Sequence, residues 1–328
     1  MLLVVVVLGG WEVLWRARGF RPRVESVDES WVLAFNRLQS GGTVVAGTSR
    51  IQAALDPDAF RRAFPGARPV NLSLPGNSPL PVLEYLADST DFHGLLLAEI
   101  LPLFVFDATL RSEVRGREVI ARYRRERVSP AAMWEDWLRV HALQHVVFRA
   151  PALLPGRFVR ELREGRLPVP GNAALRPDRF GPVYQRALTA TRPWDPVTGF
   201  HGLEYGIAER TGRPANQSEY DALVARIEHS VNRILDRGGR VVLLYLPACG
   251  PRRAIEERRY PRATYWDPLA RETRAVAIAA EDFPELVSFD CFDGSHLDQG
   301  DAPRFASALG KELARRFSAS GTPNDPTP

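Results

Sequence analysis

The sequence predicts an α/β protein built on a central parallel sheet. From Thr43 onward, short apolar runs bounded by turn residues alternate with helical patterns. The runs are apolar at nearly every position, as expected for strands that helices cover on both faces. With 45% hydrophobic and 25% charged residues, the 328-residue chain has the composition of a folded globular protein. We therefore expect five parallel strands between layers of helices.

The first part of the pattern contains three of these strands. Thr43–Gly47 is an apolar run, and the helix predicted over Asp56–Phe64 opens with an Asp-Pro pair, which favours a helix start. The second strand, Pro69–Leu74, ends at a Pro-Gly-Asn turn. A helix over Pro79–Asp88 then leads to the third strand, Gly94–Ile100.

The alternation stops after the third strand. A segment rich in Arg, Pro and Trp, from about residue 105 to 215, contains helical patterns near Val114–Arg127 and Ala131–Val147. We name residues 105–215 the insertion. It predicts a helical excursion from the sheet between the third and fourth strands.

The pattern resumes with a helix over Ser218–Asp236, which a Gly-Gly pair terminates. The remaining predicted elements are the strand Arg240–Leu246, the helix Asp267–Ala280, the strand Leu286–Asp290 and the helix Ala302–Phe317. The α/β domain thus spans residues 43–317. Ser318–Pro328 is polar and Pro-rich, and we expect it to be disordered.

Residues 1–20 predict a hydrophobic membrane anchor. Met1–Trp15 is apolar except for Glu12, and four arginines follow by residue 23. A helix of this length is about 22 Å long, shorter than the roughly 30 Å hydrocarbon core of a bilayer. The segment also lacks the basic start and the cleavage site of a secretory signal. We favour an anchor whose beginning is truncated over a helix of the soluble core, and either orientation in the membrane stays open.

Charge and cysteine content bound the function. The net charge is only +4, from 43 basic and 39 acidic residues, so we expect no nucleic-acid partner. The two cysteines, Cys249 and Cys291, lack the spacing of metal ligands. We favour two buried, unpaired cysteines. A bridge between them is the alternative, because both follow predicted strand ends.

Two further patterns receive a structural interpretation. His141 and His145 are four residues apart on a helical pattern, but Ala142 replaces the Glu of a metalloprotease motif, so no metal site is expected. The arginines between residues 111 and 127 are interrupted by glutamates. We favour a solvated helix face there, with contact to anionic lipid or an anionic polymer as the alternative.

Two short motifs far apart in the chain indicate chemistry. Gly47-Thr48-Ser49 follows the first strand, and Asp293-Gly294-Ser295-His296 precedes the last helix. Ligands of parallel sheets bind at the carboxyl ends of the strands, where both motifs fall. A serine at a strand-to-helix turn is placed to be a nucleophile. His296 is the candidate general base, and Asp293 the candidate residue that orients it.

These motifs resemble the SGNH/GDSL hydrolase superfamily, which has a flavodoxin-like sheet and four sequence blocks. Gly47-Thr48-Ser49 is similar to the block of the nucleophile, although Thr48 replaces the usual Asp. Asn71-Leu72-Ser73-Leu74-Pro75-Gly76 resembles the second block, which implies that the Gly76 N–H contributes to the oxyanion hole. Asp293 and His296 match the last block. The resemblance implies no cofactor and no metal ion.

The third block departs from the family pattern. The family places an oxyanion-donating Asn just after the third strand, where this chain has Leu103 or a neighbour. Asn77 is a second candidate donor because it follows Gly76 directly. One lost oxyanion donor typically raises the barrier by about 2.7–4 kcal/mol.

The anchor followed by a Gly-Thr-Ser-Arg block also resembles membrane-anchored bacterial SGNH-like proteins of cell-envelope acyl transfer. This implies an extracytoplasmic serine esterase or O-acyltransferase that acts on an acyl ester of a carbohydrate, with a membrane-bound O-acyltransferase as partner. The alternative is a non-catalytic SGNH-like protein that assembles the envelope or binds carbohydrate.

Overall fold

The protein is described here by a computed structural model. It describes residues 2–20, 27–138, 141, 145–147, 150–168, 179–180, 212–246, 248–287, 289, 291, 294–298 and 300–319. The predicted tail therefore lies outside the described residues, apart from the last two residues of α17 (Ala302–Ala319).

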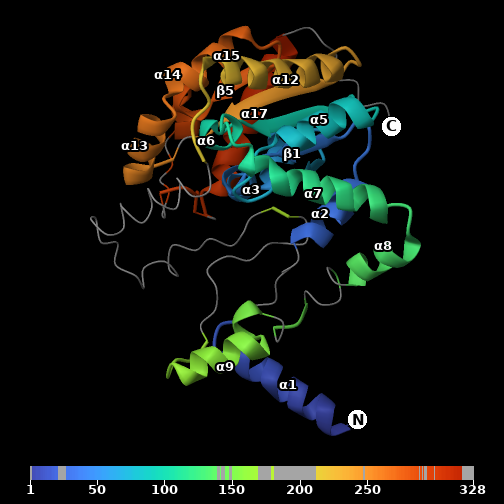
Figure 1. The fold of residues 1–328 in the computed structure, drawn as a ribbon. Coiled ribbons are helices and arrows are strands. Elements are labelled where there is room, and N and C mark those ends of the chain that lie inside the picture. The colour runs from blue at the N-terminus through green and yellow to red at the C-terminus, as the bar shows by residue number, and fades with distance from the viewer. Residues whose placement is uncertain are drawn as a thin grey trace.

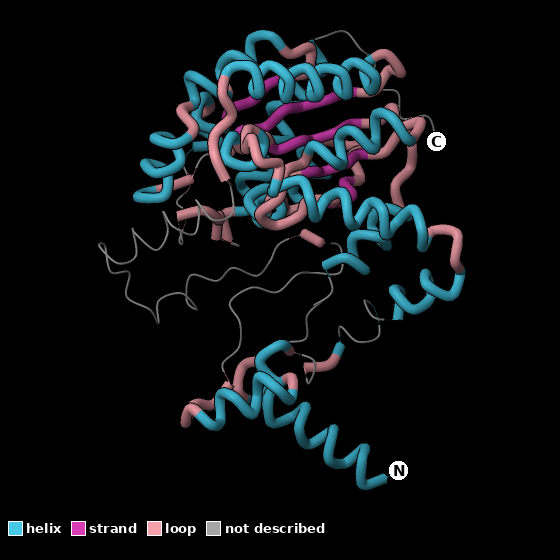
Figure 2. The backbone as a smooth tube through the Cα atoms, in the orientation of Figure 1, coloured by secondary structure: helices cyan, strands magenta, loops and turns pink. Residues whose placement is uncertain are grey.

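A five-stranded parallel sheet forms the centre of the molecule, as predicted (Figure 2). Its strands are β1 (Thr43–Ala46), β2 (Pro69–Asn71), β3 (Leu95–Glu99), β4 (Arg240–Tyr245) and β5 (Val276–Ala279). The strand order is β2-β1-β3-β4-β5, which is the flavodoxin-like order. The direction of strand addition reverses at β1, so the carboxyl ends of β1 and β3 flank the position at which such sheets bind ligands.

Successive residues of the strands pack against different helices. Val44 and Ala46 belong to a core with α2 (Val27–Asn36), α5 (Leu80–Ser89), α7 (Arg111–Glu126) and α12 (Gln217–Leu235). Val45 belongs to the core on the other face, with α3 (Ser49–Ala54), α4 (Pro57–Ala63) and α17. The sheet is therefore covered on both faces, which explains why its strands are apolar throughout.

The predicted position of the fifth strand is wrong. Leu286 and Val287 are helical instead, because Pro284 begins a short helix, α16 (Pro284–Val287). The strand is β5, which lies inside the helix predicted over Asp267–Ala280; only α15 (Asp267–Glu272) is helical. The Ala-rich sequence of β5 is compatible with a helix locally, but pairing with β4 from Val242↔Val276 to Tyr245↔Ala279 fixes it as an edge strand.

A helical segment precedes α12 between β3 and β4, as predicted. Its helices are α6 (Pro102–Val105), α7, α8 (Pro130–Trp137), η3 (Pro151–Leu153) and α9 (Pro155–Arg163). Within the predicted helical stretch Ala131–Val147, the α-helix α8 extends to Trp137, and residues 139–140 and 142–144 lie outside the described residues. Between β4 and the last helix lie α13 (Gly250–Arg259), α14 (Arg262–Tyr265) and η4 (Ala280–Asp282).

The insertion leaves and rejoins the core at one place. Asp107 and Pro214 form an antiparallel bridge. Two backbone hydrogen bonds support it, from Ala108 N–H to Arg213 O at 3.0 Å and from Ala215 N–H to Phe106 O at 2.9 Å. The two ends of the insertion are therefore held side by side.

Helix α1 (Leu2–Ala17) packs against the insertion rather than against the sheet (Figure 1). The rings of Trp11 and Trp15 lie 5.2 and 5.8 Å from that of Phe158 in α9. Glu12, the acidic residue within the apolar segment, accepts the Val147 N–H at 2.8 Å. These residues form an apolar cluster separate from both cores of the sheet. None of the helices among the described residues has both the length and the apolar character needed to cross a bilayer.

Because α1 contributes to a separate cluster, deleting residues 1–20 should leave the α/β domain folded. We expect cooperative thermal unfolding, measured by circular dichroism, with a melting temperature near that of the full chain. Trp31→Ala is the contrasting control, because Trp31 is fully buried in the core and donates to Leu72 O. It should cost about 3–5 kcal/mol. Loss of the cooperative transition on deletion would instead make α1 part of the core.

Candidate active site

Ser49 begins helix α3 directly after β1. Thr48 is the N-cap, in extended conformation, and its hydroxyl accepts the Arg50 N–H at 3.1 Å. This cap ends the strand and starts the helix within three residues. Ser49 is left half-buried at the carboxyl end of the sheet, with its side chain available to other segments.

The structure brings Ser49 and His296 into contact. Ser49 Oγ and His296 Nε2 are 2.7 Å apart, within hydrogen-bond distance. The two residues are separated by 247 positions in the chain. This is the geometry required of a nucleophile and its general base. Asp293 lies outside the described residues.

A closed loop holds His296 in place. Cys291 and Leu297 form a backbone bridge on either side of it. Gly294 has a positive φ of 77°, a conformation that favours glycine, and its carbonyl accepts the Cys249 N–H at 2.9 Å. The loop is thus attached to the chain that follows β4.

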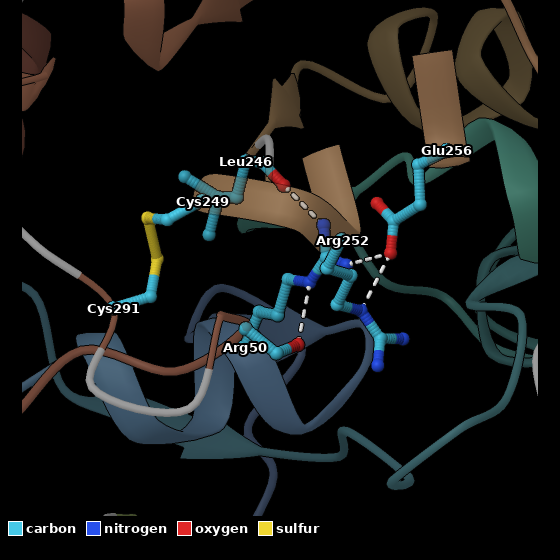
Figure 3. Close-up of a disulfide and its surroundings, with 7 residues drawn as sticks. Arg50, Leu246, Cys249, Arg252, Glu256 and Cys291 are labelled. Carbon is cyan, nitrogen blue, oxygen red and sulfur yellow. Dashed lines mark hydrogen bonds and ion pairs between the residues drawn. A yellow bond between two sulfur atoms is a disulfide. The ribbon is translucent and has the colours of Figure 1, made fainter. Parts of the chain in front are cut away.

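The favoured prediction of two unpaired cysteines is wrong, and the alternative holds. Cys249 and Cys291 form a disulfide, with Cα atoms 5.6 Å apart (Figure 3). Cys249 is the N-cap of α13, and Cys291 lies in the loop that carries His296. The bridge ties the base-bearing loop to the sheet covalently.

Arg50 makes a second, noncovalent link between the same segments. Its buried guanidinium donates to Ser295 Oγ at 3.1 Å and to Leu246 O at 2.9 Å, and pairs with Glu256 (Figure 3). Arg252 also binds Glu256, at 2.7 Å. Arg50 directly follows Ser49 in sequence and its partner Ser295 precedes His296, so this network fixes the two candidate catalytic residues through their neighbours.

Glu99, the last residue of β3, contacts the turn that carries Ser49. It is fully buried, and its Oε2 accepts the Thr48 N–H at 2.6 Å. A Cβ atom on Gly47 would lie 2.6 Å from the Glu99 Cβ and 2.7 Å from its Oε2, so only glycine fits there. The other carboxyl oxygen, Oε1, is buried and has no hydrogen-bond partner in the described part of the chain.

The surroundings of Glu99 change its protonation. Burial raises its pKa from 4.5 to about 7, against the opposing effects of the Thr48 N–H and of Arg50. The carboxyl group thus titrates near neutral pH. It is hydrogen-bonded to the N–H of Thr48, the residue before Ser49.

The proposed oxyanion residues lie next to the same turn. Leu74 N–H donates to Gly47 O at 2.9 Å, which places the Pro75-Gly76-Asn77 turn beside the strand end of β1. Gly76 has a φ of 70°. The Asn77 side-chain amide donates to Pro75 O at 2.7 Å, so one of its two N–H groups is occupied within this turn.

The insertion supports this turn through a buried arginine. Arg179 donates to Asn71 O at 3.0 Å, to Ser73 O at 2.7 Å and to Ser30 Oγ at 2.6 Å. In return, Asn71 Nδ2 donates to Arg179 O at 2.7 Å. Burial lowers the pKa of Arg179 to about 9. The insertion is therefore in contact with the end of β2, from which the chain continues to Gly76.

Leu103 does not reach the site. It is 2% exposed and belongs, in α6, to the apolar core against α5 and α12. An Asn there would be buried among apolar side chains instead of donating to an oxyanion. The strand ends at Glu99, and it is this residue that contacts the turn of Ser49.

A cavity of about 250 Å³ adjoins the Ser49–His296 pair. Arg50 and Ser295 line it, rather than Ser49 and His296 themselves. Most of its remaining wall is apolar, from Ala54, Leu246, Ala248, Ala280, Leu286, Phe289, Leu297 and Phe305. An apolar group of modest size could occupy this space.

The arginines of α7 and His141, to which the sequence analysis gave a structural interpretation, make contacts within the fold. Arginines of α7 pair with carboxylates, including Arg115 with Asp28 and Arg122 with Asp136. His141 contacts Arg37 at 3.1 Å. The described residues contain no group of three or more side chains able to hold a metal ion.

Sequence reasoning did not identify Glu99 or Arg50 as site residues. A signal for Glu99 was present, because it is an acidic residue at the end of an otherwise apolar strand. Arg50 is the arginine of the Gly-Thr-Ser-Arg block, but nothing in the sequence indicated its contacts with Ser295 and Glu256.

No protein-family model matches the chain, and no curated protein matches it either.

Replacing Glu99 by Gln should make the stability of the protein less sensitive to a rise in pH from acidic to neutral. Because the folded-state pKa lies above 4.5, the stability contributed by the protonated carboxyl is lost as pH rises through about 7. The melting temperature of Glu99→Gln minus that of wild type should therefore rise between about pH 5 and pH 8. Glu285→Gln, at an exposed position, is the matched control and should show no such trend. A difference independent of pH would mean that Glu99 is not buried as described.

Proposed function

We propose that the protein is an SGNH-type serine esterase or O-acyltransferase that acts on an acyl ester, and that a cell-envelope carbohydrate carries or receives the acyl group. The observation that carries this proposal is the 2.7 Å contact between Ser49 Oγ and His296 Nε2. It joins the two residues that the sequence motifs single out. The flavodoxin-like strand order and the location at the carboxyl ends of the strands support the same assignment.

The mechanism follows from the roles of the groups. Ser49 Oγ attacks the acyl carbonyl carbon while His296 Nε2 takes its proton, and the carbonyl oxygen becomes an oxyanion. The Ser49 and Gly76 backbone N–H groups, with Asn77 as a further candidate, stabilise that charge. The imidazolium then protonates the leaving alkoxide, and an acyl-enzyme remains. Asp293 holds the imidazole in the tautomer that this transfer requires.

The second half of the reaction decides between hydrolysis and transfer. Water attacking the acyl-enzyme gives hydrolysis, whereas a sugar hydroxyl gives O-acylation, with His296 accepting the proton in either case. The apolar cavity lined by Arg50 and Ser295 is a candidate site for the acyl group. A membrane-bound O-acyltransferase is the proposed partner in the transfer reaction.

The disulfide supports an extracytoplasmic location, because such bridges persist mainly in oxidising compartments. Together with the apolar α1, it favours a domain attached to the outer side of a bacterial membrane. This location gives access to carbohydrates of the envelope.

One observation favours a second candidate function. Leu103 is buried in the core, and the Asn77 amide is partly occupied, so the oxyanion hole has fewer side-chain donors than the family pattern. A non-catalytic SGNH-like protein that binds carbohydrate or assists envelope assembly would tolerate this loss. The two candidates differ in whether Ser49 is an activated nucleophile.

A fluorophosphonate probe separates them, because it labels activated serines. We expect labelling of wild type at Ser49, located by peptide mass spectrometry, and none of Ser49→Ala. His296→Ala should lower labelling and ester turnover by at least about a thousandfold, and Asp293→Asn should also be severe. Ser40→Ala is the control and should label normally, because Ser40 precedes β1 whereas Ser49 follows its carboxyl end. Undiminished turnover of a cognate ester by Ser49→Ala would remove the mechanism, and absence of labelling in folded wild type would favour the binding protein.

A further inference from the structure

Exposed apolar side chains are concentrated in one part of the molecule. Apart from Leu110, Val114 and Val287, every exposed large apolar residue of the described chain lies within residues 6–14 or 128–167. These stretches contain α1, α8 and α9. Soluble proteins rarely gather exposed apolar groups in this way without a partner to cover them.

The three helices lie on the same side of the sheet (Figure 1). Helices α1 and α9 pack together through Trp11, Trp15 and Phe158. This packing covers only part of α1, because Val6, Val7 and Val13 are 61, 59 and 67% exposed. Helix α8 packs against α2 and α7 of the main body, and Asp136 of α8 pairs with Arg122 of α7.

Helix α9 has two chemically distinct faces. At 100° per residue, Phe158, Val159 and Leu162 share one face, while Arg157 and Arg160 lie on the other. Phe158 packs on Trp15, but Val159 and Leu162 remain 45 and 46% exposed. The apolar face of α9 thus continues the uncovered apolar surface of α1.

The arginines of α9 differ from Arg115, Arg117 and Arg122 of α7, each of which is paired with a carboxylate. In the described part of the chain, no carboxylate pairs with Arg157, Arg160 or Arg163. An exposed helix with an apolar face and unpaired arginines is complementary to anionic headgroups above acyl chains.

Helix α8 contributes exposed aromatic rings. Trp134 and Trp137 are stacked with centroids 4.9 Å apart, and are 61 and 42% exposed. Tryptophan is enriched at the boundary between headgroups and acyl chains. A saccharide could also stack on these rings, but the neighbouring exposed Val128 and Leu138 favour a lipid environment.

We propose that α1, α8 and α9 form a single surface that binds an anionic phospholipid bilayer. The apolar faces of α1 and α9 enter the boundary between headgroups and acyl chains, and Arg157, Arg160 and Arg163 contact lipid phosphates. Trp134 and Trp137 lie at headgroup level. The bilayer contact thus involves the insertion as well as the amino-terminal segment. This proposal does not depend on catalysis, because vesicle binding is measured without turnover.

The first test is sedimentation of the purified full chain with vesicles of phosphatidylcholine, with and without 30% phosphatidylglycerol. We expect at least tenfold stronger binding to the anionic vesicles, with loss of the difference in high salt. R157E/R160E should weaken anionic-vesicle binding about tenfold or more. R304E/R315E, which reverses two exposed arginines of α17, is the matched control and should bind like wild type. Equal binding of both double variants, or no preference for anionic vesicles, would overturn the role of α9.

The second test separates this surface from an anchor formed by α1 alone. Brominated phospholipids quench tryptophan fluorescence on contact, and we expect W134F/W137F to lose a substantial part of the quenching seen in wild type. Unchanged quenching would overturn the role of α8. If tryptophan fluorescence changes with a soluble polysaccharide but not with vesicles, the bilayer proposal is wrong and the ligand of this surface is a carbohydrate. Thermal melting of each variant checks that the exposed substitutions leave the fold intact.

Discussion

The parallel register of β1 and β3 is the constraint on which the candidate site depends. Ala46 pairs with Ala98, so the next residues, Gly47 and Glu99, lie side by side at the strand ends. Because Gly47 has no side chain, the Glu99 carboxyl can accept the Thr48 N–H and stabilise the turn. A shift of one residue would place an aliphatic side chain at this point and leave the turn without its buried acceptor.

The loop that carries His296, on the other side of the site from Ser49, is held by cross-links rather than by strand pairing. In the described residues, the element before the loop of His296 is helix α16 rather than a strand, and the loop is linked to its surroundings by the Cys249–Cys291 bridge and by Arg50. Both connect to the chain just after β4. A hydrogen bond between catalytic groups tolerates errors of only a few tenths of an ångström, so a covalent and an ionic support acting together are physically reasonable.

The sequence predicted those features that depend on residues close together in the chain, and missed several that depend on residues far apart in it. Continuous apolar strands and their helices are encoded locally, so four strands and the convergence of Ser49 with His296 were predictable. The segment Val276–Ala279 was misassigned because its Ala-rich sequence suits a helix until β4 offers an edge to pair with. The roles of Glu99 and Arg50 arise from residues brought together across the fold. No spacing along the chain encodes such contacts.

The paired ends of the insertion have a consequence for how this architecture can vary. Because Ala108 and Ala215 are hydrogen-bonded to Arg213 and Phe106, the long excursion between β3 and β4 is equivalent, for the sheet, to a closed hairpin loop. Lengthening such a loop costs little free energy, since the entropy of closure grows only with the logarithm of its length. Segments of very different size could be exchanged at this junction, provided that they replace the core contacts of α7 and the hydrogen bonds of Arg179, while the strands keep their positions.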